Sequence, residues 1–571
     1  MITCFTRLWI LLPFLLSVTN SFGQPDEACL PPTAKDKLDI NHIRTTYHPS
    51  AQLWFDQTSP GFEIISPTPG EPPLSLLVAG GLWIAGINPQ NNLYTAAHTY
   101  HADNSDYWAG PLDLATGTTD YPVCLHFNRL WKVLAAEVAS HISDFNDNGV
   151  IDGPVPAAVL AWPGRNNPNS FLGNGFELPL DQPLAPFVDR NGNGDYEPML
   201  GDFPKIKGDQ ALWWVFNDEG GGALHKETNG LALRVEVQAL AYAFEGANDD
   251  NLSNTTFLEF KIINRRTEKL DSIFASLWTD FDLTYFLDDN FGCIPSDKIA
   301  YLYSAEGVQN PDCFNTPQDD CIATPIITVK QLIGPKGESG ADVGFSSFIT
   351  FNNPTWGNPL PSVGTTDPSV DFEYYNYMQG KWKNGQALTY GGDGFNPANP
   401  PTNFMFPGNP ADSADWSMCS TSLPIYDRRM MINSGPFSLA PGESTTVSYA
   451  IFPVFTDDYP CPDITPIVDI GNEIQEVFDG LTAVTNTLGN KETLRFYPNP
   501  MHSEGRLVLS DTRHTIQEAI LLGADGRVVK NYRHLHTHEL VIQRDNLPAG
   551  LYFYKILTSD GQWSTGRAVM D

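Results

Sequence analysis

The composition and the pattern of this sequence predict an all-β protein built from sandwiches. Its 571 residues include 47 Gly and 46 Pro, and only 18% are charged, which is typical of short strands joined by turns and not of helical bundles. Apolar residues make up 41%, enough for packed cores, so global disorder is excluded. Several segments alternate apolar and polar residues, which is the period of a half-buried strand.

The clearest strands lie in two distant parts of the chain. Residues 257–281 form two alternating runs around a polar turn, and residues 437–455 pass through a Pro-Gly corner into another run. An immunoglobulin-like sandwich uses such units of strand, corner and returning strand at its edge. We therefore expect residues 250–285 and 425–456 to belong to one immunoglobulin-like β-sandwich, with a loop-rich insertion at 286–424 between them.

Apolar residues recur at helical spacing from Ile467 to Leu481, so we expect a closing helix that ends at Gly480. The polar run after it is typical of a linker. Short strands upstream, such as 74–87 and 231–244, are expected to pack on the same core. The expected segments are a signal peptide at 1–23, an N-terminal β-rich region at 24–245, the sandwich with its insertion and helix at 246–481, a linker at 482–493 and a C-terminal domain at 494–571.

The first 23 residues have the pattern of a secretory signal peptide. A single charge at Arg7 precedes an apolar run over residues 8–16, and Ser21 to Gly23 forms a small-x-small cleavage site. The apolar run is about ten residues long, whereas a membrane-spanning helix needs roughly 20. We expect the signal to be cleaved and the mature protein to be exported without a transmembrane segment.

Charge divides the chain into two parts. The net charge is −34, yet the stretch from Lys491 to Asp571 holds ten Lys/Arg and nine Asp/Glu, so the negative charge lies in the body. A body this acidic repels nucleic acid and anionic membrane surfaces, and it favours cations as small partners. The C-terminal segment is expected to be a separate module.

Cysteines indicate an oxidising compartment and disulfides that brace loops. In such a compartment most cysteines pair, and Cys313 with Cys321 closes the shortest loop. The spacing is not a zinc pattern, and the odd number leaves one cysteine over. The seven cysteines after the signal peptide are Cys29, Cys124, Cys293, Cys313, Cys321, Cys419 and Cys461.

Alternating segments and Gly- and Pro-containing turns predict a small antiparallel, immunoglobulin-like sandwich after residue 493. Its motifs are, in order, Phe496-Tyr497-Pro498-Asn499-Pro500, Asp525-Gly526-Arg527-Val528-Val529, Asn546-Leu547-Pro548-Ala549-Gly550-Leu551-Tyr552-Phe553 and Gly566-Arg567-Ala568-Val569-Met570. This combination resembles the type A C-terminal sorting domain of proteins exported by the type IX secretion system of Bacteroidetes. The sorting-motif residues are Tyr497, Pro498, Asn499, Pro500, Gly526, Gly550 and Tyr552.

The resemblance implies transport by the general secretion route to the periplasm and recognition of the tail by an outer-membrane translocon. It also implies removal of the tail, followed by release or by attachment to surface lipopolysaccharide. An ordinary immunoglobulin-like terminal domain would show the same strand pattern. Stretches of the body, at 81–86, 106–113, 278–293 and 427–437, resemble a class of large exported Bacteroidetes proteins that brings no established activity.

Two segments, 144–152 and 189–197, have the oxygen spacing of calcium loops. A hard cation needs six to eight oxygens, and Asp or Asn at alternating positions with Gly at the sixth supplies them in a tight turn. The segments resemble the calcium loops of dockerins and thrombospondin type 3 repeats, although Val155 stands where an EF-hand has Glu. The alternative is a pair of Asx-rich turns that cap their own backbone. The expected calcium ligands are Asp144, Asn146, Asn148, Asp152, Asp189, Asn191, Asn193, Asp195 and Glu197.

A third acidic group follows the end of a predicted strand and comprises Asp280, Asp282, Asp288 and Asp289. It could bind a cation, supply paired carboxylates for glycoside hydrolysis, or form a solvated loop. The choice depends on distances that the sequence does not contain.

Other candidates have simpler explanations. His534, His536 and His538 would share one face of a strand and could hold a transition metal, but a solvated strand is the simpler interpretation. Trp213 and Trp214 are expected to fill a core. The sequence has no H-E-x-x-H, G-x-S-x-G or phosphate-loop motif.

Together these patterns predict an exported, calcium-braced protein, secreted or held at the cell surface, that binds, adheres or scaffolds. The alternative is a secreted hydrolase that degrades glycan or protein and uses the third acidic group.

Overall fold

The structure is a computed structural model. It describes residues 28–56, 61–65, 73–99, 105–170, 182–220, 225–246, 250–283, 286–305, 324–421, 423–456, 458–486, 494–509, 515–523, 528–559 and 563–570. The expected signal peptide, Cys313, Cys321 and Gly526 lie outside the described residues.

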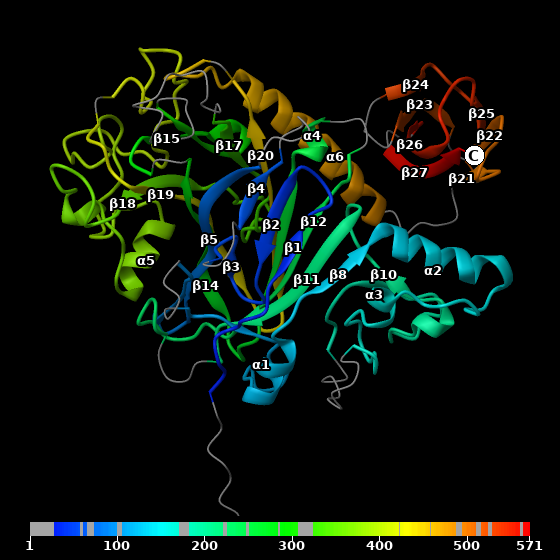
Figure 1. The fold of residues 1–571 in the computed structure, drawn as a ribbon, viewed down its shortest axis with the longest axis horizontal. Coiled ribbons are helices and arrows are strands. Elements are labelled where there is room, and N and C mark those ends of the chain that lie inside the picture. Colours follow the sequence, from blue (N-terminus) through cyan, green and yellow to red (C-terminus); the bar gives the residue numbers. More distant parts are fainter. Residues whose placement is uncertain are drawn as a thin grey trace, which may run out of the picture.

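Two nine-stranded antiparallel sheets form the body, and with 39% strand against 14% helix the all-β prediction is confirmed (Figure 1). The first sheet consists of β1 (Asp36–Leu38), β2 (Ile43–Tyr47), β3 (Gln52–Leu53), β4 (Phe62–Ile64), β5 (Leu74–Ile87), β6 (Leu93–Ala96), β14 (Leu270–Asp282), β18 (Ser347–Asn352) and β19 (Arg428–Leu439). Its order is β1-β2-β3-β5-β14-β19-β18, with β4 beside β2 and β5 and with β6 beside β5.

The second sheet consists of β7 (Trp108–Ala109), β8 (Trp131–Leu134), β11 (Gln210–Asn217), β12 (Val235–Ala243), β13 (Thr256–Asn264), β15 (Asp289–Ile294), β16 (Ile299–Ser304), β17 (Ile326–Ile333) and β20 (Ser444–Val454). Its order is β15-β16-β17-β20-β13-β12-β11-β7, with β8 beside β11. The inner faces of both sheets contribute to one core, where Leu82 and Leu277 meet Trp214 and Phe260.

Two corners join the sheets. The chain passes from β13 in the second sheet to β14 in the first, and it returns from β19 to β20. The corners are hydrogen-bonded to each other, because Asn264 N–H donates to Glu443 O at 3.0 Å and Gly442 N–H donates to Asn264 O at 2.8 Å. Gly442 has a φ of 75°, which glycine adopts without strain. The two distant segments expected to share a sandwich therefore do so.

The expected boundary at residue 245 falls inside a sheet, since β12 before it pairs with β13 after it along their whole length. The expected insertion at 286–424 is less loop-rich than predicted, because β15, β16, β17 and β18 join the sheets. After residue 352 it consists mainly of turns around η5 (Val363–Thr365) and α5 (Asp371–Met378).

A second core lies on the outer face of the second sheet, beneath α6 (Thr465–Asn486). Ile467, Ile474 and Phe478 of the helix share this core with Phe452 and with Trp213. The helix does not end at Gly480 and extends into the first part of the expected linker. Glycine inside a helix costs only about 1 kcal/mol relative to alanine, which the packing of the apolar face outweighs.

Smaller elements surround the sheets. They are α1 (Tyr121–Phe127), α2 (Ala135–Asn148), α3 (Ala157–Leu160), α4 (Asp250–Ser253), the hairpin of β9 (Phe187–Val188) and β10 (Phe203–Pro204), η1 (Pro198–Leu200) and η2 (Pro295–Asp297). Disulfides join Cys29 to Cys124 and Cys419 to Cys461, while Cys293 is a buried free thiol.

The C-terminal segment forms a small sandwich with its own core, as predicted (Figure 1). One sheet contains β21 (Leu494–Tyr497), β22 (Glu504–Leu509) and β25 (Glu539–Gln543). The other contains β23 (Ile516–Gly523), β24 (Val528–Tyr532), β26 (Gly550–Thr558) and β27 (Trp563–Met570).

Candidate functional site: a buried acidic cluster

Two aspartates at the end of β14 face away from the second sheet. Side chains alternate along a strand, so Asp280 and Asp282 share one face while Phe281 takes the other. Phe281 packs between the sheets at 5.5 Å from Trp54, ring centroid to ring centroid. Trp278 lies on the same face as the two aspartates, where α5 covers the first sheet.

The neighbouring strand β19 adds two charged side chains to this face. Since Thr279 pairs with Met430, Asp280 and Arg429 are the next residues to stand opposite each other. Arg429 Nε lies 3.4 Å from Asp280 Oδ2, and Arg429 Nη1 lies 3.0 Å from Asp427 Oδ1. Asp367, from the turn before α5, approaches the same Nε at 3.6 Å. We call Asp280, Asp282, Asp367, Asp427 and Arg429 the acidic cluster.

The acidic cluster holds more negative than positive charge. Three carboxylates share the Arg429 guanidinium, and Asp282 adds a fourth negative group. Burial raises the pKa of Asp280 well above its usual value, that of Asp282 to about 7 and that of Asp367 to about 6, against the opposing effect of Arg429. Asp280 Oδ1 is buried without a hydrogen-bond partner among the described residues. Buried carboxylates in this state take up a proton or a cation.

The cluster has the dimensions of a hard-cation site. Within the described part of the chain, one group of acidic, His or Cys side chains is close enough to hold a metal ion, and it consists of Asp280, Asp282 and Asp427, with ligand oxygens all within 4.8 Å of one another. Calcium–oxygen distances of about 2.3–2.6 Å place opposite ligands roughly 5 Å apart, so these oxygens fit one coordination shell. Carboxylate oxygens suit calcium, magnesium or manganese.

Aromatic side chains form the floor beside the acidic cluster. Trp83 stacks on Trp278 at 6.0 Å between ring centroids, and Tyr374 of α5 lies 4.8 Å from Trp83. A Cβ at Gly81 would lie 2.4 Å from His98 O, so glycine lets the backbone at 98–99 cross the strand here. A cavity of about 40 Å³, the aromatic cavity, is lined by Trp83, Thr99, Glu227, Trp278, Phe351, Asp367, Pro368 and Tyr374.

Glu227 is one of two acidic residues that line the aromatic cavity and is only 8% exposed. Thr99 Oγ1 and the Tyr374 hydroxyl donate to its Oε1 at 2.9 and 2.7 Å. Its Oε2 has no hydrogen-bond partner among the described residues. Burial raises the pKa of Glu227 to about 7.

A buried charged triad of Asp106, His225 and Asp218 lies behind Glu227. The two ring nitrogens of His225 each lie 2.7 Å from a carbonyl oxygen, of Thr95 and of Asp218. Both nitrogens must carry a proton to donate to these carbonyls, so His225 is an imidazolium. Asp106 Oδ2 and Asp218 Oδ2 lie 3.7 and 3.9 Å from the ring and neutralise it.

The sequence identified two of the five members of the acidic cluster. Asp280 and Asp282 belong to it, but Asp289 starts β15 in the second sheet and Asp288 precedes it. Asp289 Oδ2 accepts from Leu283 N–H, and Asp288 Oδ2 accepts from Ser304 Oγ. Asp427 takes their place in the group that could hold a metal. Asp367, Glu227 and His225 were also missed, because single acidic or histidine residues carry no spacing signal.

The first expected calcium loop is largely helical. Asp144, Asn146 and Asn148 lie in the last turns of α2, which ends at Gly149 with a φ of 85°. Alternate residues on a helix point in different directions, so the three side chains do not converge as in a loop. Asp144 accepts from Gly153 N–H at 3.2 Å, and Asn148 Nδ2 donates to Asp152 Oδ2 at 2.9 Å.

The second expected loop is a turn that bonds to itself. Asp189 accepts from the N–H groups of Gly192 and Gly194, both at 2.7 Å. Asn191 Nδ2 and Asn193 Nδ2 both donate to Glu197 Oε2, at 3.0 and 2.6 Å. Asn166 Nδ2 donates to Asp195 Oδ1 at 2.5 Å. Arg190 Nη2 donates to Asn146 Oδ1 at 3.4 Å and so connects the two segments. Calcium binding by the two segments stays a prediction.

The remaining candidates separate clearly. Trp213 and Trp214 are both buried, in the outer and the inner core of the second sheet, which confirms that they fill cores. The tail histidines His534, His536 and His538 are exposed as expected, but they precede β25 and do not lie on a strand. No described helix is long and apolar enough to cross a membrane.

Several sorting-motif residues lie in the described part of the tail sandwich. Asn499 Oδ1 accepts from Val569 N–H at 2.7 Å, which connects the first motif to the last strand. Gly550 begins β26, and the buried Tyr552 donates its hydroxyl to Pro548 O at 2.9 Å. Tyr497 is 48% exposed and available to a partner.

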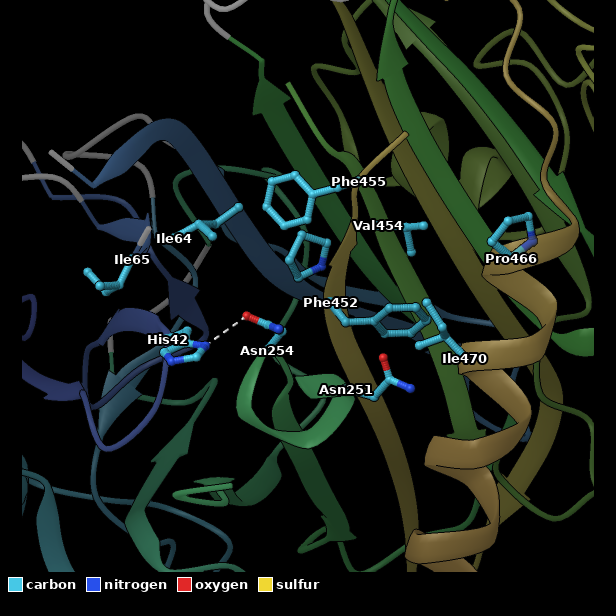
Figure 2. A pocket seen from close by; sticks show the side chains of 11 residues that line it. His42, Ile64, Ile65, Asn251, Asn254, Phe452, Val454, Phe455, Pro466 and Ile470 are labelled. Atoms are coloured by element: carbon cyan, nitrogen blue, oxygen red, sulfur yellow. Dashed lines mark hydrogen bonds between the residues drawn. The ribbon is translucent and has the colours of Figure 1, made fainter. Parts of the chain in front are cut away.

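A larger cavity of about 370 Å³ opens between β4, α4, β20 and α6 (Figure 2). Its lining is mostly apolar and includes Phe455, which is 59% exposed. Its polar groups are already paired: His42 Nδ1 lies 3.2 Å from Asn254 Oδ1, and Asn251 Nδ2 donates to Glu473 Oε2 at 2.6 Å. This cavity therefore offers no set of convergent polar groups.

Comparisons with known proteins add little to this geometry. No family model matches the chain, and no curated protein matches it. A solved polysaccharide lyase resembles it with a TM-score of 0.16 and 8% identity over 59% of this chain and 34% of the lyase. Dimeric latent PorU of Porphyromonas gingivalis resembles it with a TM-score of 0.12 and 10% identity over 63% of this chain and 31% of PorU. The chain thus spans about a third of each structure, and likeness at this level carries no functional argument.

Proposed function

We propose that this is an exported binding protein whose body is braced by a divalent cation, calcium in particular, in the acidic cluster. The observation that carries the proposal is the set of three carboxylates with oxygens within 4.8 Å, whose nearest basic partner is the shared Arg429. A cation bound there would connect the aspartates of β14 to Asp427 next to β19 and would balance the negative charge that Arg429 alone does not neutralise. Calcium fits best because several oxygens of irregular arrangement suit its flexible shell better than the octahedral shell of magnesium.

Metal binding is tested by calorimetric titration of metal-free protein with calcium and with magnesium. We expect calcium to bind more tightly than magnesium, and Asp427→Asn to weaken binding at least tenfold. Asp288→Asn is the matched control, because this aspartate is close in sequence to Asp282 but bonds to Ser304 instead. Equal calcium affinity in wild type and Asp427→Asn would show that the cluster is not the site.

Export through the type IX secretion system is supported by the separate fold of the tail and by the exposed Tyr497 in its motif. The two disulfides support an oxidising destination, where such bonds persist. Deletion of residues 491–571 should strand a folded body in the periplasm. Normal levels of the truncated protein outside the cell would refute the sorting role, including any attachment to lipopolysaccharide through the tail.

At the acidic cluster, a binding role is favoured over hydrolysis by the size of the aromatic cavity beside it, since the larger cavity of about 370 Å³ has no acidic side chain in its lining. Its volume of about 40 Å³ holds a water molecule or one small group. Ligand pockets that enclose a sugar ring or a drug-sized molecule measure about 300 Å³ or more. A screen of glycan and peptide substrates in the presence of calcium tests this, and turnover that Asp280→Asn abolishes in a folded protein would favour the hydrolase.

A further inference from the structure

The aromatic cavity contains a buried acceptor that lacks a donor. Glu227 is 8% exposed, and its Oε1 receives two hydroxyl groups while its Oε2 receives none from the described residues. A buried polar atom without a partner destabilises the folded protein. Glu227 lines the cavity, so a donor placed there could pair with this carboxylate.

The same cavity is negatively charged. Asp367 lines it together with Glu227. Arg429 approaches Asp367 at 3.6 Å but is shared with Asp280 and Asp427, and the charge of His225 is taken up by the triad behind Glu227. A donor with a positive charge therefore fits better than a neutral one.

The lining suits an organic cation better than a metal ion. Glu227 and Asp367 are its two carboxylates, and the close group of three carboxylates that could hold a metal among the described residues lies in the acidic cluster instead. Four of the eight lining side chains are aromatic. Aromatic rings attract organic ammonium groups by their quadrupoles, most strongly in a desolvated site. These rings are at most 2% exposed, so the site is desolvated.

Charge and hydrogen bonding define the head group of the ligand. Glu227 Oε2 lacks a donor among the described residues, and a primary ammonium group can supply an N–H whereas a quaternary ammonium has none. We infer that the aromatic cavity binds a primary ammonium group carried on an unbranched alkyl chain. The side chain of Asp367 is 30% exposed and marks the side from which the chain would leave. This inference rests on the proposed binding role and names its ligand class.

The test is a calorimetric titration of the folded, full-length protein with n-butylammonium, tetramethylammonium and n-butanol. We expect only n-butylammonium to bind, and Glu227→Gln to weaken it at least tenfold. Glu373→Gln is the matched control, since Glu373 lies on α5 but accepts from Ser369 outside the cavity, and it should bind as wild type does. Equal binding of tetramethylammonium or n-butanol, or no binding of n-butylammonium, would overturn the inference.

Ionisation of Glu227 gives a second measurement. Burial raises its pKa to about 7, and the titratable groups that face it are Asp106, Asp367 and Tyr374. The carboxyl ionises as pH rises from 6 to 8 while an alkylamine stays protonated, so affinity should increase over this range. A pH-independent affinity in wild type would contradict recognition by Glu227.

The same chemistry could come from a free amine or from a lysine side chain. Titration with a short peptide that has one central lysine, and with its ε-acetylated form, distinguishes a free amine from a lysine side chain as the ligand. Binding of the unmodified peptide alone assigns the site to lysine, and binding of n-butylammonium without either peptide assigns it to free amines. Calcium titration of the same samples reports on the acidic cluster, so loss of amine binding with intact calcium binding defeats this inference and leaves the proposed function standing.

Discussion

The two acidic regions of the body were built in opposite ways. The Asx-rich segments at 144–152 and 189–197 are contiguous in sequence, largely exposed and hydrogen-bonded to their own backbone. The acidic cluster brings together residues from positions 280 to 429, buries them wholly or in part, and leaves Asp280 Oδ1 without a hydrogen-bond partner among the described residues. Side chains that water or nearby backbone can satisfy have little need of an ion, whereas buried carboxylates do.

The largest expected effect comes from removing the positively charged side chain of the acidic cluster, Arg429. Arg429→Met leaves the largely buried Asp280 and Asp427 and the partly exposed Asp367 without their shared guanidinium, and breaking a buried network of this kind costs about 3–5 kcal/mol. The free energy of unfolding in urea measures this. Arg533→Met is the control, because that side chain is 67% exposed and its pair with Glu518 contributes about 0–1 kcal/mol. Similar values for both variants would mean that the cluster is not held by Arg429.

The buried charged triad should make stability depend on pH. The pKa of His225 is raised by Asp106 and Asp218 against the effect of its burial, so its contribution is fully present below the usual value of 6.5 and is lost as pH rises through the raised value. Burial raises the pKa of Asp218 to about 6. Because its carboxyl ionises less readily in the folded protein, stability also decreases as pH rises from about 4 to 6.

One released proton lowers the free energy of unfolding by at most about 1.4 kcal/mol per pH unit. Urea unfolding from pH 6 to 9 should therefore show a decline in wild type that is smaller in His225→Gln. A steeper decline in the variant, or stability that increases with pH in wild type, would contradict an imidazolium at this position.

Calcium sharpens the comparison between the two regions. An ion that binds only the folded protein stabilises it by about 2.7 kcal/mol at 100 times its Kd, so a chelator should lower the melting temperature. We expect Asp427→Asn to remove most of this response and Asp189→Ala to remove little. The opposite result would assign the calcium to the Asx-rich segments, and coincident melting in calcium and chelator would exclude both.

The smallest effect is expected in the Asx-rich segments without any metal. Asp144→Ala removes hydrogen bonds to Gly153 N–H at the protein surface, and such a change shifts the melting temperature by less than about 2 °C. Limited proteolysis between Asp144 and Glu197 provides a local measurement. A shift as large as that of Arg429→Met would reverse the ranking of the two regions.

The sequence predicted those features that depend on local pattern. Alternation identified β13, β14 and β20, helical spacing identified α6, and charge and turn pattern separated the tail. Alternation also placed Asp280 and Asp282 on one face. Gly480 was misjudged because glycine can stay helical when its neighbours pack, as they do on the second sheet.

The rest of the site depends on pairing over long distances. Asp427 meets Asp282 because β19 pairs with β14 in a register that two bulges adjust, and no local signal encodes it. Glu227 and Asp367 come from turns that tertiary packing brings to Trp83. The expected loop at 144–152 became helical because Ala135 to Phe145 favour a helix that continues into it.

The sheet crossings carry a consequence for the timing of folding. β14 pairs with β5 almost 200 residues earlier and with β19 about 150 residues later. β13 likewise pairs with β20, which follows much later in the chain. Chains whose contacts span such distances fold slowly, because the entropy of closing long loops is lost before the non-local contacts stabilise the chain. The first sheet is not complete before residue 439 has been synthesised, and the second is not complete before residue 454. For most of its synthesis the nascent chain therefore lacks partner strands that both sheets need.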